Sequence, residues 1–153
     1  MNEATKNINC LIKKYVDGLL YLSTAATEDD EVASMENTDR LDIPDGVEVY
    51  EIDGPFFFGL ASRFEELEQM KKPGTKVRII RMRKVPFIDS TGINNLRNLC
   101  ERTHKRGVTV ILSGVTEKVY NSLVKFGVDL EIGPDHIFPH IVPALEKARE
   151  LVK

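Results

Sequence analysis

The chain has 153 residues, of which 42% are hydrophobic and 29% charged, and its formal net charge is −3. This length suits one hydrophobic core, because domains usually have about 100–150 residues. Chains that bind nucleic acid are usually basic, so the charge argues against a nucleic-acid partner. The two cysteines, Cys10 and Cys100, form no CxxC pattern, which indicates free thiols in a reducing compartment.

The apolar runs predict no membrane-spanning segment, because none approaches the roughly 20 residues that a bilayer requires. The first residues carry no basic segment ahead of an apolar run, so we expect no signal peptide. Taken by itself, this polypeptide is expected to be soluble and cytoplasmic.

Residues 1–42 are predicted to be an appendage to the main domain. Apolar residues at helical spacing between residues 8 and 20 predict one extra, amphipathic N-terminal helix. Such a helix packs on its own domain, on a copy of it, on a partner or on a membrane surface. Residues 23–42 are polar and acidic, which is typical of a linker.

From residue 43 to residue 153, predicted strands and helices alternate. Strands are expected at residues 47–52, 56–58, 76–82, 108–112 and 130–132. Helices are expected at residues 60–70, 93–103, 116–126 and 141–151, the third capped by Thr116 and ended by Gly127. This order predicts an α/β sandwich with a small mixed, partly parallel sheet and about four α-helices.

The most informative segment is the junction Asp89-Ser90-Thr91-Gly92, between a predicted strand and a predicted helix. Asp, Ser and Thr oxygens accept hydrogen bonds from the free amides of a first helical turn, so a plain helix cap is the favoured interpretation. A helix N-terminus also stabilises an anion, so the alternative is a phosphate carried by Thr91. It would add about two negative charges beside Asp89 and disturb a packed interface.

This motif resembles the STAS superfamily, which joins anti-sigma factor antagonists with the cytoplasmic tails of SulP anion transporters. GVEVYEIDGPFFFG at residues 46–59 and RMRKVPFID at residues 81–89 are similar to SulP-type STAS domains. The stretch from NSL at residues 121–123 to IFPHI at residues 137–141 is similar to their closing part. The resemblance covers about residues 43–151 and implies a STAS-type sandwich.

In SulP transporters, the resemblance implies, this domain follows the last membrane helix and acts in assembly or regulation through protein contacts. The implied partner is the transmembrane domain of its own transporter or a regulatory protein, at the cytoplasmic face of the membrane. A homodimer is a further implied arrangement. The alternative is a free-standing antagonist-like protein switched by phosphorylation at Thr91, the position of the kinase site in that branch. A small nucleotide-responsive sensor is the third hypothesis, since STAS relatives have been linked to weak nucleotide binding.

No cofactor, metal or catalytic site is predicted. The three histidines, His104, His136 and His140, have no thiolate or carboxylate at a standard ligand spacing. The sequence has no GxxxxGK[ST] or GxGxxG loop. Neither Ser90 nor Thr91 has a base nearby in the sequence, so we expect no enzyme.

Two groups of residues are candidates for a contact surface. Phe56, Phe57 and Phe58 are expected to be mostly core, with at least one ring facing outward because side chains alternate along a strand. The basic cluster Arg78, Arg81, Arg83 and Lys84 is interpreted as a solvated strand edge. Its alternative role is contact with acidic lipid headgroups or with a transporter loop.

Overall fold

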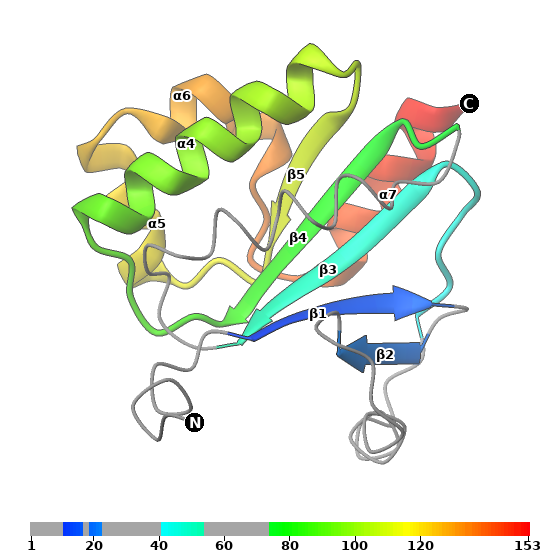
Figure 1. Ribbon diagram of the computed structural model, residues 1–153, viewed down its shortest axis with the longest axis horizontal. Coiled ribbons are helices and arrows are strands. Elements are labelled where there is room, and N and C mark those ends of the chain that lie inside the picture. The colour runs from blue at the N-terminus through cyan, green and yellow to red at the C-terminus, as the bar shows by residue number, and fades with distance from the viewer. Residues whose placement is uncertain (1–10, 17–18, 23–40, 54–73) are drawn as a thin grey trace, which may run out of the picture.

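The computed structural model describes residues 11–16, 19–22, 41–53 and 74–153, which form an α/β sandwich around a five-stranded sheet (Figure 1). The strands are β1 (Leu11–Val16), β2 (Leu19–Leu22), β3 (Val47–Asp53), β4 (Val77–Lys84) and β5 (Thr109–Ser113), in the spatial order β2-β1-β3-β4-β5. β1 is antiparallel to β2 and β3, whereas β3, β4 and β5 are parallel to one another. The predicted mixed, partly parallel sheet is confirmed.

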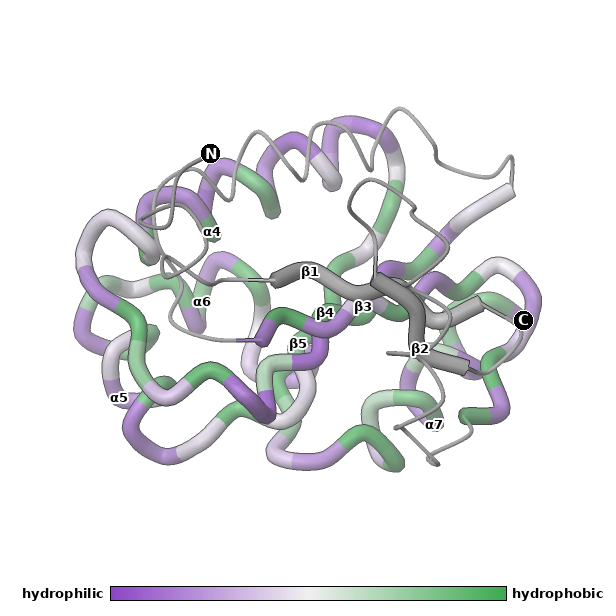
Figure 2. Tube along the Cα trace, turned by 60° about the horizontal axis from the view of Figure 1, so that its bottom comes forward, coloured by the Kyte–Doolittle hydropathy of each residue, from purple (hydrophilic) through white to green (hydrophobic). Residues whose placement is uncertain are grey.

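Helices cover both faces of the parallel strands (Figure 1). α4 (Ser90–Lys105), α5 (Glu117–Lys125) and α6 (Val128–Ile132) lie on one face, and α7 (Ile141–Val152) lies on the other. A short 3-10 helix, η1, spans Pro134–His136. Figure 2 shows hydrophilic and hydrophobic residues interleaved along these helices, as expected where one side of a helix faces a sheet.

Side-chain alternation along the strands divides the core into two layers. Tyr50, Ile80 and Leu112 belong to the layer that packs under α4, α5 and α6. Their odd-numbered neighbours, such as Val49 and Ile79, belong to the layer that packs under α7. The three parallel strands are therefore buried on both faces, which explains the nearly continuous apolar sequence of β5.

The helix-end signals in the sequence agree with the structure. Thr116 is the N-cap of α5, and its Oγ1 accepts a hydrogen bond from the Val119 amide at 3.3 Å. Gly127 follows the helix with a φ of 75°, in the left-handed region that favours glycine. The predicted cap and stop are confirmed.

Two predicted elements are wrong. Residues 11–16 and 19–22 form strands rather than part of a helix, because β1 pairs with the edge of β3 from Leu11 opposite Asp53 to Lys14 opposite Tyr50. Residues 130–132 belong to α6 rather than to a strand. Val128 and Ile132 are buried one helical turn apart while Leu130 is exposed. The alternation of apolar and acidic residues from 128 to 132 fits a strand equally well, so it does not reveal this helical pattern.

Other predictions lie outside the described residues: the strand at 56–58, the helix at 60–70 and nearly all of the linker at 23–42. The domain boundary at residue 43 stays a prediction, although β1 and β2 join the same sheet as β3. Among the described residues, no helix is long and apolar enough to cross a membrane.

Gly114, directly after β5, provides a test of how closely β4 and β5 approach. Its φ is 66°, and an added Cβ would lie 2.7 Å from the Arg83 nitrogen and 2.9 Å from the Arg83 Cα. We expect Gly114→Ala to lower the free energy of unfolding by about 3 kcal/mol, because left-handed strain and overpacking add. Gly127→Ala has a similar φ with open space around it, so we expect a loss of about 1 kcal/mol. Urea unfolding measures both, and equal losses would contradict the close approach.

Candidate functional site

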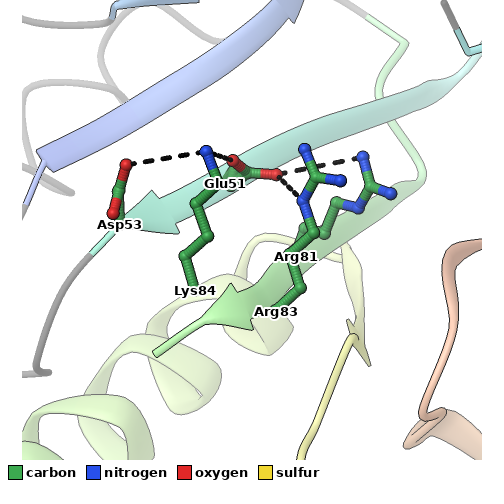
Figure 3. Close-up of polar contacts among 5 residues, drawn as sticks. All are labelled: Glu51, Asp53, Arg81, Arg83 and Lys84. Atoms are coloured by element: carbon green, nitrogen blue, oxygen red, sulfur yellow. Dashed lines mark hydrogen bonds and ion pairs between the residues drawn. The ribbon is translucent and has the colours of Figure 1, made fainter. Parts of the chain in front are cut away.

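The carboxyl ends of β3, β4 and β5 meet at one edge of the sheet, where open parallel sheets usually place their sites. Two features lie there. One is the turn from β4 into α4, which contains Asp89, and the other is a group of charged side chains around Glu51 near the ends of β3 and β4 (Figure 3).

Asp89 is the N-cap of α4. Its backbone is extended, with a φ of −93° and a ψ of −179°, and its Oδ1 accepts a hydrogen bond from the Gly92 amide at 2.7 Å. Its carbonyl accepts the first helical bond, from Ile93 N at 2.8 Å. The helix-cap interpretation of this turn is therefore confirmed. Ser90 and Thr91 are exposed on the first turn, while Gly92 is buried.

An exposed aromatic ring lies beside this turn. Phe87 is 40% exposed, between the buried anchors Val85 and Ile88. Lys118 Nζ, on the first turn of α5, lies 5.9 Å from the centre of the Phe87 ring, at the range of a cation–π contact. We call this region the turn surface; it consists of Phe87, Asp89, Ser90, Thr91 and Lys118.

Glu51 is a fully buried carboxylate surrounded by cations (Figure 3). Its Oε1 lies 2.9 Å from Arg83 Nε and 3.8 Å from Arg81 Nη1, and its Oε2 lies 3.7 Å from Lys84 Nζ. Lys84 Nζ also lies 3.9 Å from Asp53 Oδ2. These five residues contribute three positive and two negative charges, so the group carries a formal charge of +1.

The interpretation of the basic cluster as a solvated strand edge is wrong. β4 lies between β3 and β5, and Arg78 and Arg81 are buried within the sheet. The parallel register explains how they are neutralised: Glu48 lies opposite Arg78, and Glu51 opposite Arg81. Arg78 Nη2 donates to Glu48 Oε1 at 3.3 Å, and its guanidinium lies 5.3 Å from the centre of the Tyr50 ring.

Only the end of the cluster reaches solvent. The side chain of Arg83 is 30% exposed and that of Lys84 is 43% exposed. Their role as a contact surface stays a prediction, as does that of Arg81, which is buried. Phe56, Phe57 and Phe58 lie outside the described residues.

The acidic partners Glu48 and Glu51 were missed by the sequence-based prediction. A usable signal exists, because Glu48 and Glu51 are three residues apart and so are Arg78 and Arg81. Two adjacent parallel strands with this spacing bring both pairs into register at once. Side-chain alternation then places one pair on each face of the sheet.

The residues that could bind a metal do not come together in the described part of the chain, which contains no suitable group of three such side chains. His136 lies in η1, and its Nδ1 is 3.3 Å from the Ile132 carbonyl oxygen. His104 is near the end of α4, and His140 is the N-cap residue of α7.

The family model of the STAS domain matches residues 40–144. Over 97 residues the chain is 33% identical to the putative sulfate transporter YvdB of Bacillus subtilis (strain 168), a match that covers 61% of this chain. It spans only 18% of that transporter's length.

Several solved structures are similar over most of the chain. A sulfate transporter family protein from Wolinella succinogenes is 43% identical with a TM-score of 0.70, covering 76% of this chain and 95% of its own. The STAS domain of a SulP transporter from Vibrio cholerae is 33% identical with a TM-score of 0.65, covering 80% and 94%. A putative anti-sigma factor antagonist from Thermotoga maritima, 21% identical with a TM-score of 0.59 over 71% of this chain and 92% of its own, shares the fold.

The charge group around Glu51 can be tested by neutralising one acid at a time. Glu51→Gln keeps the shape but leaves three cations around a neutral, buried amide, so we expect it to lower the free energy of unfolding by about 3–5 kcal/mol. Asp53→Asn is the matched control, because Asp53 is one-third exposed, and we expect a loss of about 1 kcal/mol or less. Urea denaturation followed by circular dichroism gives both values. An unchanged midpoint for Glu51→Gln would show that the buried ion pairs do not stabilise the sheet.

Proposed function

This chain belongs to the STAS domain family, and from that membership we propose that it is the cytoplasmic regulatory domain of a SulP-type anion transporter. One observation carries the proposal: the match covers almost all of a solved SulP transporter STAS domain but a small part of a putative sulfate transporter. That relation is expected of one domain in a larger membrane protein. The transported anion, its pathway and the energy source would then belong to the membrane part.

The proposed mode of action is protein contact in assembly or regulation. The turn surface suits this role because its exposed groups stand on rigid supports. Asp89 fixes the start of α4, and Val85 and Ile88 anchor the segment that carries Phe87. Phe87 supplies apolar area, whereas Lys118 and the exposed hydroxyls supply polar contacts. Arg83 and Lys84 extend the surface toward the end of β3.

We propose no catalytic role. His104, the nearest histidine to Ser90 in sequence among the described residues, lies 14 residues further along α4. At 1.5 Å per residue this is about 21 Å, far beyond the reach of a general base.

Site-specific photo-crosslinking in the source cells tests the transporter proposal. A photoreactive phenylalanine analogue at Phe87 should crosslink to peptides from a cytoplasmic loop of a membrane protein, identified by mass spectrometry. The matched control places the analogue at Val142, which is 63% exposed on α7, on the opposite side of the sheet. We expect no such peptide from Val142. Peptides from soluble proteins alone at Phe87 would overturn the proposal.

A phosphorylation switch is the second candidate function, in a free-standing protein of the antagonist type. The observation in its favour is the exposure of Thr91 on the first turn of α4, where free amides and the helix dipole stabilise an added phosphate. A cognate kinase should then label the wild-type chain and the Ser90→Ala variant, but not Thr91→Ala. Equal labelling of both variants, or none of the wild type, would exclude a switch at Thr91.

A further inference from the structure

A groove lies between α4 and α6, away from the turn surface at the start of α4. Arg97, Cys100, Glu101 and His104 occur at helical spacing on one side of α4, and Val128, Glu131 and Ile132 of α6 complete the lining. The groove has a volume of about 220 Å³. Figure 1 shows α6 near α4, on the same face of the sheet.

The floor of the groove is apolar. Cys100, Val128 and Ile132 are all buried. Burial, with a smaller contribution from the nearby Glu131 carboxylate, raises the pKa of the Cys100 thiol to about 12. The thiol is therefore uncharged at neutral pH, and the floor offers no charged group to a ligand.

The rim of the groove is negatively charged. Arg97 Nε donates to Glu131 Oε2 at 2.7 Å, and Arg97 Nη2 donates to the Phe126 carbonyl at 2.7 Å, so its guanidinium is already occupied. Within the described ranges the exposed Glu101 takes part in no ion pair. In the lining, the one guanidinium of Arg97 stands against the carboxylates of Glu101 and Glu131, and these three groups sum to a formal charge of −1.

An exposed apolar residue lies next to this rim. Leu130, directly before Glu131 on α6, is 73% exposed, more than any other large hydrophobic side chain in residues 41–53 and 74–153. Phe126, whose carbonyl holds Arg97, is also exposed. Carboxylates above an apolar floor suit a Lys or Arg side chain, whose stem packs on apolar surface while its head stays polar. Leu130 lies on the outward face of α6, about 100° round the helix from Glu131, so a segment that continues past the rim would bring an adjacent apolar residue against it.

We propose that the groove between α4 and α6 binds a basic polypeptide segment in which Lys or Arg adjoins an apolar residue, namely a cytoplasmic loop of the transporter's membrane part. The identity of this partner rests on the proposed function, because cytoplasmic loops of membrane proteins carry an excess of Lys and Arg. A second copy of the chain suits the groove less well, since the whole chain carries a charge of −3.

A peptide titration of the full ¹⁵N-labelled chain tests the groove directly. The probe is an acetylated and amidated decapeptide with two lysines flanked by leucines. We expect its addition to shift amide signals from Arg97 to His104 and from Val128 to Ile132, with saturation below about 1 mM peptide. A control peptide with glutamates in place of the lysines should cause no shift, because its charges face the carboxylates of the rim.

Substitutions at exposed positions test whether the peptide binds at the rim of the groove or elsewhere on the surface. Glu101→Gln and Leu130→Ser should each weaken peptide binding by about fivefold or more, because each removes one of the two contacts. Glu117→Gln on α5 and Val142→Ser on α7 remove the same kinds of group elsewhere and should leave the affinity unchanged. The amide spectrum of each variant checks that the fold is intact.

Several results would overturn the proposal. These are no shift at about 1 mM peptide, equal shifts with the glutamate peptide, or shifts confined to Ser90–Gly92. Binding of n-butylamine as tightly as the peptide would indicate a site for small amines instead. Self-association that buries the groove, detected by sedimentation, would indicate a second copy. The titration uses the isolated chain, so a negative result would overturn the groove proposal without affecting the transporter proposal. A negative result of Phe87 crosslinking would overturn the transporter proposal without showing whether the groove binds the peptide.

Discussion

The parallel pairing of β3 with β4 is the constraint on which the rest of the molecule depends. It places Glu48 opposite Arg78 and Glu51 opposite Arg81, so four charged side chains are buried in the sheet with partners from the neighbouring strand. Buried charges without partners strongly destabilise a fold. A register slip by one residue would separate both pairs and would also move each side chain of the slipped strand into the other core layer. The ion pairs therefore make one register much more favourable than its neighbours.

The candidate site follows from that register. Since β3, β4 and β5 are parallel, α4 and α5 both begin at the carboxyl edge of the sheet. There Lys118, on the first turn of α5, approaches Phe87, in the segment that leads into α4. The same edge receives the exposed ends of Arg83 and Lys84. The turn surface thus combines residues from positions 87–91, where the chain passes from β4 into α4, with Lys118 on α5.

The sequence predicted those parts of the fold in which local signals agree with the tertiary structure. The buried apolar run of β5, the cap at Thr116 and the stop at Gly127 are examples, and the Asp89 cap was also predictable from residue type and position. Residues 11–16 and 19–22 were mispredicted because their apolar spacing fits a helix, while β1 pairs with the edge of β3 and β2 pairs with β1. Glu48 and Glu51 were missed as partners of the basic cluster because charge pairing across strands depends on strand order, and their spacing is informative only once β3 and β4 are known to be neighbours.

The length of α4 has a consequence for how a partner is held. Its 16 residues span about 24 Å, so one rigid element carries the turn surface at its start and the groove along its second half. If a partner binds at both proposed places, contact at one holds it near the other at a high effective concentration, and two weak contacts would then give one strong attachment. The distance between the turn surface and the groove would also select among partners, because only a partner whose two contact segments match this distance could bind both. Specificity would arise from spacing as much as from the chemistry of either contact.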